Sequence, residues 1–132
     1  MKTRLAVFAI GLISAAAPLL AHHSFSAEFD NSKPVKIQGT VTKVDWLNPH
    51  IWIYLDVKDD AGKVASWQCE GGPPNTLTRN GWTKNDLKKG DLISVTGTHA
   101  KDATNTCNAT SVKFADGRTV FAGSSNPDAQ KQ

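Results

Sequence analysis

Apolar and polar residues alternate along most of the chain from residue 35 onward. Between Val35 and Val41 every second residue is apolar or glycine, and the residues between them are polar or charged. This period of two predicts a half-buried β-strand. The phase slips by one residue at Thr42-Lys43 and then resumes, which predicts a β-bulge where the strand bends. Residues 22–34 have no clear period, and we expect an N-terminal arm there.

The same alternation continues in shorter segments. We expect further strands over residues 50–58, 63–70, 91–98 and 109–114, and a short tail strand over 119–121. In the segment 50–58 the apolar face holds Ile51, Ile53, Leu55 and Val57, and Trp52 and Tyr54 lie opposite. Between the third and fourth segments, Asn75 is expected to cap a short helical turn. Thr83 to Asp86 resembles a capping box.

The order is therefore three strands, a short helical segment and two or three further strands. This order, with a long bent first strand, predicts an all-β domain with a short helical insert over residues 35–122. The expected architecture is a small Greek-key barrel of the OB type. An open β-sandwich or roll is the alternative. The polar residues 123–132 are expected to form a disordered tail.

The first 21 residues have the layout of a secretory signal peptide. Lys2 and Arg4 precede an apolar run over residues 5–13, and small residues follow up to Ala21. The run is too short for a membrane anchor. We expect cleavage after Ala21 and a periplasmic or secreted protein.

The net charge of the predicted mature chain narrows the classes of partner that we expect it to bind. Removing the 21 residues of the predicted signal from 132 leaves 111, with 13 basic and 12 acidic residues and a formal net charge of +1. A near-neutral chain lacks the basic surface that nucleic acids select. We therefore expect no nucleic acid and no membrane span, and a monomer that binds an envelope protein or a small ligand.

Two cysteines, Cys69 and Cys107, are the only ones in the chain. An even pair in an exported protein predicts one disulfide. It would close a loop of about 39 residues and stabilise the fold by about 4 kcal/mol on the chain-entropy model. The alternative is that both thiols are reduced and buried.

A histidine pair follows the predicted cleavage site. If His22 is the mature N-terminus, its α-amine and its imidazole can chelate one metal ion together, and nitrogen ligands suit Cu(II). His23, His50 and His99 are the further candidate ligands of this copper hypothesis. A polar N-terminus without function is the alternative.

A second group of candidate residues is aromatic and polar. We expect a binding surface formed by Trp46, Asn48, His50, Trp52, Tyr54 and Glu70. His50 is either a ligand or hydrogen-bond donor at the barrel mouth or a turn residue whose ring binds a backbone carbonyl. Glu70 is either a metal ligand or an ion-pair partner. At least two of the four tryptophans are expected in the core.

No catalytic arrangement stands out. The serines lack a nucleophile-elbow context, and the cysteines lack C-x-x-C spacing. We therefore expect a non-catalytic binding or accessory module. The Cu(II)-binding protein, with or without oxidoreductase activity, is the alternative.

Several short motifs occur along the mature chain: residues 21–25 with 28–30, 39–41, 46–50, Pro74-Asn75 with Leu77, Gly81-Trp82, Gly90-Asp91 and 95–97. Together these motifs resemble a known family, the small exported bacterial proteins catalogued as domain of unknown function 6152. The resemblance covers nearly the whole mature chain and implies an envelope location and a small β-barrel-like domain, but no substrate or cofactor.

Overall fold

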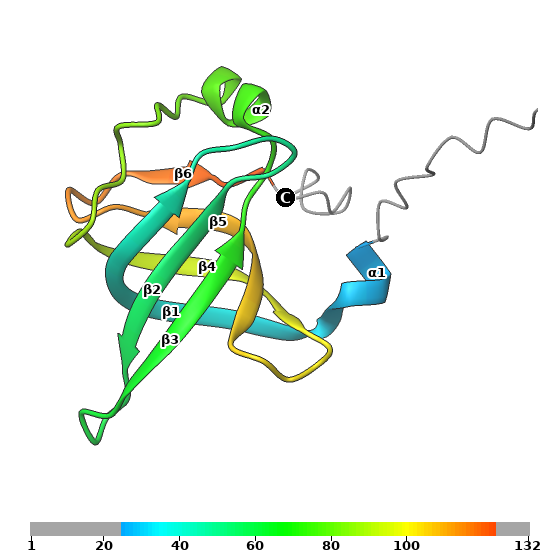
Figure 1. Cartoon of the computed structure of the whole chain (residues 1–132), viewed down its shortest axis with the longest axis vertical. Coiled ribbons are helices and arrows are strands. Elements are labelled where there is room, and N and C mark those ends of the chain that lie inside the picture. The colour runs from blue at the N-terminus through cyan, green and yellow to red at the C-terminus, as the bar shows by residue number, and fades with distance from the viewer. Residues whose placement is uncertain (1–24, 124–132) are drawn as a thin grey trace, which may run out of the picture.

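β-Strands make up most of the described part of the protein. The computed structural model describes residues 25–123, so the predicted signal peptide, His22, His23 and the tail 124–132 lie outside the described residues. The elements are α1 (Phe25–Glu28), β1 (Phe29–Asp45), β2 (Trp52–Lys58), β3 (Val64–Glu70), α2 (Pro74–Arg79), β4 (Leu92–Ala100), β5 (Thr106–Lys113) and β6 (Thr119–Phe121) (Figure 1). The predicted all-β domain with a short helical insert is confirmed. None of the helices in residues 25–123 is long and apolar enough to cross a membrane.

Hydrogen bonding between the strands closes into a ring. The sheet order is β3-β2-β1-β4-β5-β6, and a parallel pairing of β3 with β5 joins the two sides. All other pairings are antiparallel. Five strands form the ring in the order β1-β2-β3-β5-β4, and α2 lies between the third and fourth strands along the chain, which is compatible with the five-stranded OB type.

β1 is long enough to pair with two neighbours and bends between them. Its first half pairs with β4 and its second half with β2. The predicted bulge is confirmed, because the register shifts between Val41 and Lys43. The strand begins at Phe29 rather than at the predicted Val35. Phe29 is buried and pairs with Ala100, and a second register shift separates it from Pro34, which hides the period in the sequence.

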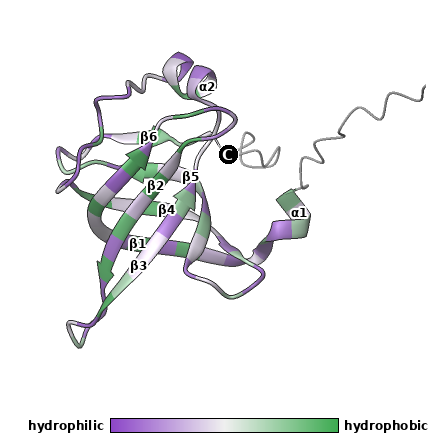
Figure 2. Cartoon of the chain, in the orientation of Figure 1, coloured by the Kyte–Doolittle hydropathy of each residue, from purple (hydrophilic) through white to green (hydrophobic). Residues whose placement is uncertain are grey.

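Alternation in β2 separates the core from the outer surface. Ile51, Ile53 and Leu55 are fully buried, whereas Trp52 and Tyr54 are partly exposed. Figure 2 shows the same alternation of hydrophobic and hydrophilic positions along the strands. The predicted faces of this strand are therefore confirmed. The rest of the core comes from the other strands, from α2 and from the segment after it, chiefly Val41, Ile93, Val95, Val112, Leu77 and Trp82.

α2 lies over one end of the ring (Figure 1). Asn75 is not its cap, contrary to the prediction: Pro73 occupies the N-cap position, and Pro74 begins the helix. Proline suits the first helical position because its fixed φ is already helical and because the N–H that it lacks would have no partner within the helix there. The Trp82 side chain beyond the helix is buried and donates from Nε1 to the Phe121 carbonyl oxygen at 2.8 Å.

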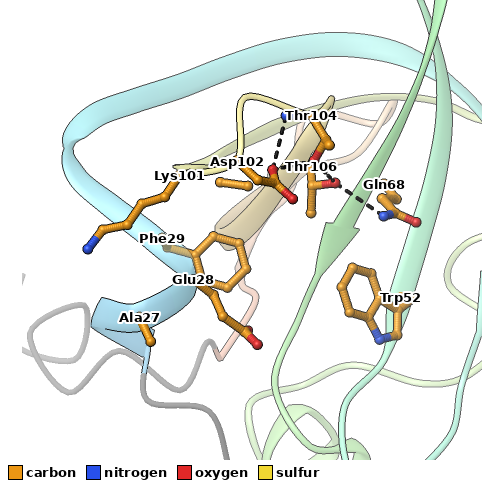
Figure 3. A pocket seen from close by; sticks show the side chains of 10 residues that line it. Ala27, Glu28, Phe29, Trp52, Gln68, Lys101, Asp102, Thr104 and Thr106 are labelled. Carbon is orange, nitrogen blue, oxygen red and sulfur yellow. Dashed lines mark hydrogen bonds between the residues drawn. The ribbon is translucent and has the colours of Figure 1, made fainter.

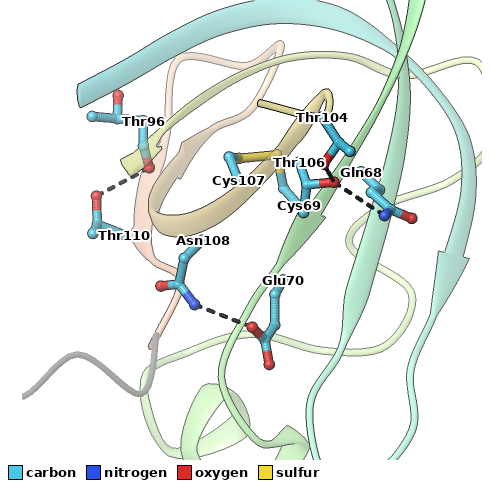
Figure 4. Close-up of a disulfide and its surroundings, with 9 residues drawn as sticks. All are labelled: Gln68, Cys69, Glu70, Thr96, Thr104, Thr106, Cys107, Asn108 and Thr110. Carbon is cyan, nitrogen blue, oxygen red and sulfur yellow. Dashed lines mark hydrogen bonds between the residues drawn. A yellow bond between two sulfur atoms is a disulfide. The ribbon is translucent and has the colours of Figure 1, made fainter. Parts of the chain in front are cut away.

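The predicted disulfide is confirmed. Cys69 and Cys107 are bonded and are direct register partners in the β3–β5 pairing, with their Cα atoms 4.5 Å apart (Figure 4). Both are fully buried. The covalent link therefore lies at the parallel pairing that closes the ring, where only three residues of each strand are paired.

Candidate functional site

The outer face of the ring near the start of β2 carries several polar and aromatic side chains. Trp52 and Tyr54 point outward because their neighbours Ile51 and Ile53 point into the core. Antiparallel pairing with β3 sets Trp52 opposite Glu70 and Tyr54 opposite Gln68. The parallel β3–β5 pairing then sets Gln68 beside Thr106 and Glu70 beside Asn108.

A pocket of about 690 Å³ opens on this face. We call it the Trp52 pocket. One wall comes from α1 and the start of β1, the opposite side from β2 and β3, and the end from the segment joining β4 to β5 (Figure 3). Its lining residues are Ala27, Glu28, Phe29, Trp52, Gln68, Ala100, Lys101, Asp102, Thr104 and Thr106.

The polar side of the Trp52 pocket is a chain of hydrogen bonds. Gln68 Nε2 donates to Thr106 Oγ1 at 3.1 Å, and the hydroxyl oxygens of Thr104 and Thr106 share a hydrogen bond at 2.9 Å. The Thr104 hydroxyl also donates to Asp102 Oδ1 at 2.7 Å, and the Thr104 backbone N–H donates to the same oxygen at 3.0 Å. These two donors hold the pKa of Asp102 below its usual range. Asp102 is therefore ionised throughout the neutral and mildly acidic range.

The α1 wall is tied to the segment that joins β4 to β5. The Lys101 backbone N–H donates to the Glu28 carbonyl oxygen at 2.8 Å, and Lys101 Nζ donates to the Ser26 carbonyl oxygen. The Phe25 and Phe29 rings are stacked with centroids 5.3 Å apart. Backbone and side-chain contacts therefore both connect this wall to the segment between β4 and β5.

A buried polar group lies at the end of β3. His50 Nδ1 donates to Glu70 Oε1, and Asn108 Nδ2 donates to Glu70 Oε2 at 3.4 Å (Figure 4 shows the second contact). The side chain of His50 is 22 % exposed and that of Glu70 is 11 % exposed, and Asn108 is fully buried. We call these three residues the His50–Glu70–Asn108 group. The His50 ring nitrogen Nδ1 therefore contacts the carboxylate of Glu70.

The other predicted binding residues lie in different surroundings. Trp46 packs beside Trp82, with ring centroids 6.2 Å apart, and contacts the core. Asn48 is exposed and precedes the cis peptide bond to Pro49. Tyr54 has Lys43 Nζ 5.1 Å from its ring centroid. The structure therefore gathers Trp52 at the start of β2, His50 two residues before it and Glu70 at the end of β3, and it turns Trp46 toward the core.

The copper hypothesis involves both described and undescribed histidines. The His99 ring meets the edge of Trp67, with centroids 5.5 Å apart. Within residues 25–123 no group of three His, Cys, Asp or Glu side chains gathers in a metal-binding arrangement. His22 and His23 lie outside that range, so copper binding stays a prediction.

Several residues of this region were not predicted from the sequence. The position of Asn108 could have been predicted from the sequence. Once Cys69 and Cys107 are bonded, parallel pairing of their strands brings the next residues, Glu70 and Asn108, together. The contact between Asp102 and Thr104 could also have been predicted, since an Asp side chain commonly accepts a hydrogen bond from the backbone N–H two residues later in a turn. Phe29, Gln68 and Thr106 carry no such signal, because their place in the pocket depends on which strands are neighbours.

The comparisons with known proteins identify the family of this chain but do not identify an activity. A family described as "Family of unknown function (DUF6152)" matches residues 9–109 of the chain. Neither the comparison with curated proteins nor the comparison with solved structures found a match.

Proposed function

Since this chain belongs to the DUF6152 family, whose description states no activity, we propose from its own site that it is a non-catalytic binding module of the periplasm or the secreted fraction. The observation that carries the proposal is the Trp52 pocket, which combines an aromatic wall with a chain of hydrogen-bonding groups. Ligand sites in proteins commonly join apolar walls to a few fixed polar groups. The location rests on the predicted signal peptide and on the disulfide, which is typical of oxidising compartments.

We propose a neutral saccharide as the ligand class. A sugar ring has one apolar face that stacks on an indole and hydroxyl groups that donate to carboxylates and amide oxygens. The pocket offers the Trp52 ring, the carboxylates of Glu28 and Asp102 and the amide of Gln68. Its two carboxylates and single ammonium group, that of Lys101, give no surplus of positive charge for phosphates or nucleic acids.

The threonine hydroxyls of the pocket are already engaged by neighbouring side chains. The Thr104 and Thr106 hydroxyls are hydrogen-bonded to each other, and the Thr104 hydroxyl is also hydrogen-bonded to Asp102.

The test is a titration of ¹⁵N-labelled protein with a panel of neutral and anionic oligosaccharides, followed through the tryptophan indole signals. We expect the Trp52 indole, assigned with Trp52→Phe, to shift with neutral members. Trp52→Ala and Gln68→Ala should weaken binding at least about tenfold, which corresponds to about 1.4 kcal/mol. Tyr54→Ala is the matched control, because Tyr54 lies on the same face of β2 outside the pocket lining.

Two results would overturn this proposal. The Trp52 signal would stay unchanged across the whole panel, or Tyr54→Ala would weaken binding as much as Trp52→Ala. Circular dichroism of each variant separates a lost contact from a lost fold.

A further inference from the structure

The strand β3 has a second neighbour along only part of its length. On one side it pairs with β2 from Val64 to Glu70. On its other side β5 pairs only with residues 68–70. Residues 64–67 therefore form an open sheet edge, in the half of the strand nearer to the β2–β3 turn (Figure 1). We call these four residues the free edge of β3.

Two residues of the free edge point their backbone hydrogen-bonding groups away from β2. The Gln68 N–H donates to the Asn105 carbonyl oxygen at 3.0 Å, so Gln68 faces the β5 side. Because backbone groups alternate between the two sides of a strand, Val64 and Ser66 face the same side as Gln68. Within residues 25–123, no backbone hydrogen bond satisfies the N–H and C=O groups of these two residues on that side.

The free edge lacks features with which proteins usually protect an exposed strand edge. Such features include prolines, β-bulges and charged side chains within the strand. The sequence of the free edge is Val-Ala-Ser-Trp, and its register with β2 is continuous. Val64 is 47 % exposed and is one of three large hydrophobic side chains that are exposed within residues 25–123. The free edge is therefore open to pairing with a further strand.

A groove beside Val64 adds a place for side-chain contact. It has a volume of about 510 Å³, and its lining includes Val64, Lys58 and Leu92. Leu92 is another of the three exposed hydrophobic side chains. In an added strand, the residue opposite Val64 places its side chain on the same face of the sheet. An aliphatic side chain at that position would cover the exposed apolar surface of Val64.

The charges near the free edge do not select a charged partner. The turn residues 58–63 carry two lysines and two aspartates, so their formal net charge is zero. The carboxylate of one of them, Asp59, already accepts hydrogen bonds from the backbone N–H groups of Ala61 and Lys63. Backbone pairing and apolar contact therefore remain as the interactions that would select the partner.

We propose that the free edge of β3 binds an extended, apolar segment of another polypeptide, which pairs with Val64 and Ser66 as an added strand. Main-chain hydrogen bonds supply the affinity in this mode of recognition. A second copy of this chain is a poorer occupant, because four residues span only about 13 Å and stable interfaces bury about 1,600 Å² in total. The proposal does not rest on the saccharide site, since none of residues 64–67 lines the Trp52 pocket.

The probe is a peptide of alternating valine and threonine with capped ends, titrated into ¹⁵N-labelled protein. Two further versions of the peptide carry N-methyl groups, one on every valine and the other on every threonine. Each version loses the N–H donors along one side of an extended strand and keeps those along the other side.

The variants change the free edge in two ways. Ser66→Pro removes an N–H that points away from β2, so the β2–β3 pairing keeps its hydrogen bonds. Val64→Lys places a charge on the edge and provides the test if Ser66→Pro does not fold. Leu47→Lys is the matched control, because Leu47 is 64 % exposed and lies outside the strands. Circular dichroism checks the fold of each variant.

The proposal predicts that the unmethylated peptide shifts the backbone amide signals of Val64 and Ser66 and slows their hydrogen exchange. Only one of the two methylated versions should lose binding. Ser66→Pro and Val64→Lys should each weaken binding at least about tenfold, the size expected for the loss of one hydrogen bond. Leu47→Lys should bind the peptide as the wild type does.

Three outcomes would overturn the proposal. The amide signals of Val64 and Ser66 would stay unchanged at millimolar peptide. The two methylated peptides would bind equally, which strand pairing does not allow. Analytical ultracentrifugation would show self-association that Ser66→Pro abolishes, which would assign the free edge to a second copy of this chain.

Discussion

Loss of the Cys69–Cys107 disulfide should remove a large part of the stability of the domain. The bond closes a loop with a sequence separation of 38 residues, for which the chain-entropy model gives about 4 kcal/mol at 25 °C. A change of this size corresponds to a fall in Tm of roughly 15–30 °C for a domain of about 100 residues. The position of the bond makes it effective, because only three register pairs join β3 to β5.

The measurement is urea unfolding of the wild-type protein with and without a thiol reductant, followed by tryptophan fluorescence and circular dichroism. Reduction of the wild type keeps both sulfur atoms in the core, so the difference reports the bond itself. Cys69→Ala/Cys107→Ala should lose a further amount of about 1–2 kcal/mol, because removal of the buried sulfur atoms leaves a cavity.

A loss below about 1 kcal/mol on reduction would refute this reasoning. The three β3–β5 pairs and the core would then hold the ring closed without covalent help. The reductant must be shown to have acted by thiol counting in denaturant, since both cysteines are fully buried.

Two further predictions concern the pocket and the sheet. Thr104→Val should raise the pKa of Asp102 toward 3.8, because the Thr104 hydroxyl is the largest cause of its lowering. The lowered pKa stabilises the fold above about pH 3.8, and this contribution is lost as the pH falls through the pKa of the folded state. An NMR titration that gives the same Asp102 pKa in the variant and the wild type would contradict this prediction. Gly97→Ala should lower the free energy of unfolding by roughly 3 kcal/mol or more, because the added Cβ would lie 2.1 Å from the Asn108 carbonyl oxygen. The control Gly62→Ala should lower it by only about 1–2 kcal/mol, because no atom lies within 4 Å of the added Cβ and the cost comes from the φ of +81°. Equal urea midpoints for the two glycine variants would show that β4 and β5 separate easily there.

The sequence by itself determined the features that depend on neighbouring residues. The period of two in β1 and β2 identified the buried faces, because side chains alternate along any extended strand. The slip at Thr42-Lys43 located the bulge for the same reason. The pairing of Cys69 with Cys107 was predicted from their even number and the predicted export, with two reduced thiols as the alternative, and the structure confirms the bond.

Only the tertiary structure decided which distant residues share a surface. The extension of β1 back to Phe29 depends on its pairing with Ala100, which lies far along the chain at the end of β4. The Trp52 pocket and the contact between Glu70 and Asn108 require both the ring order and the register of the β3–β5 pairing. A one-residue change of register would turn every side chain of a strand to the opposite face, and no local pattern in the sequence records that register.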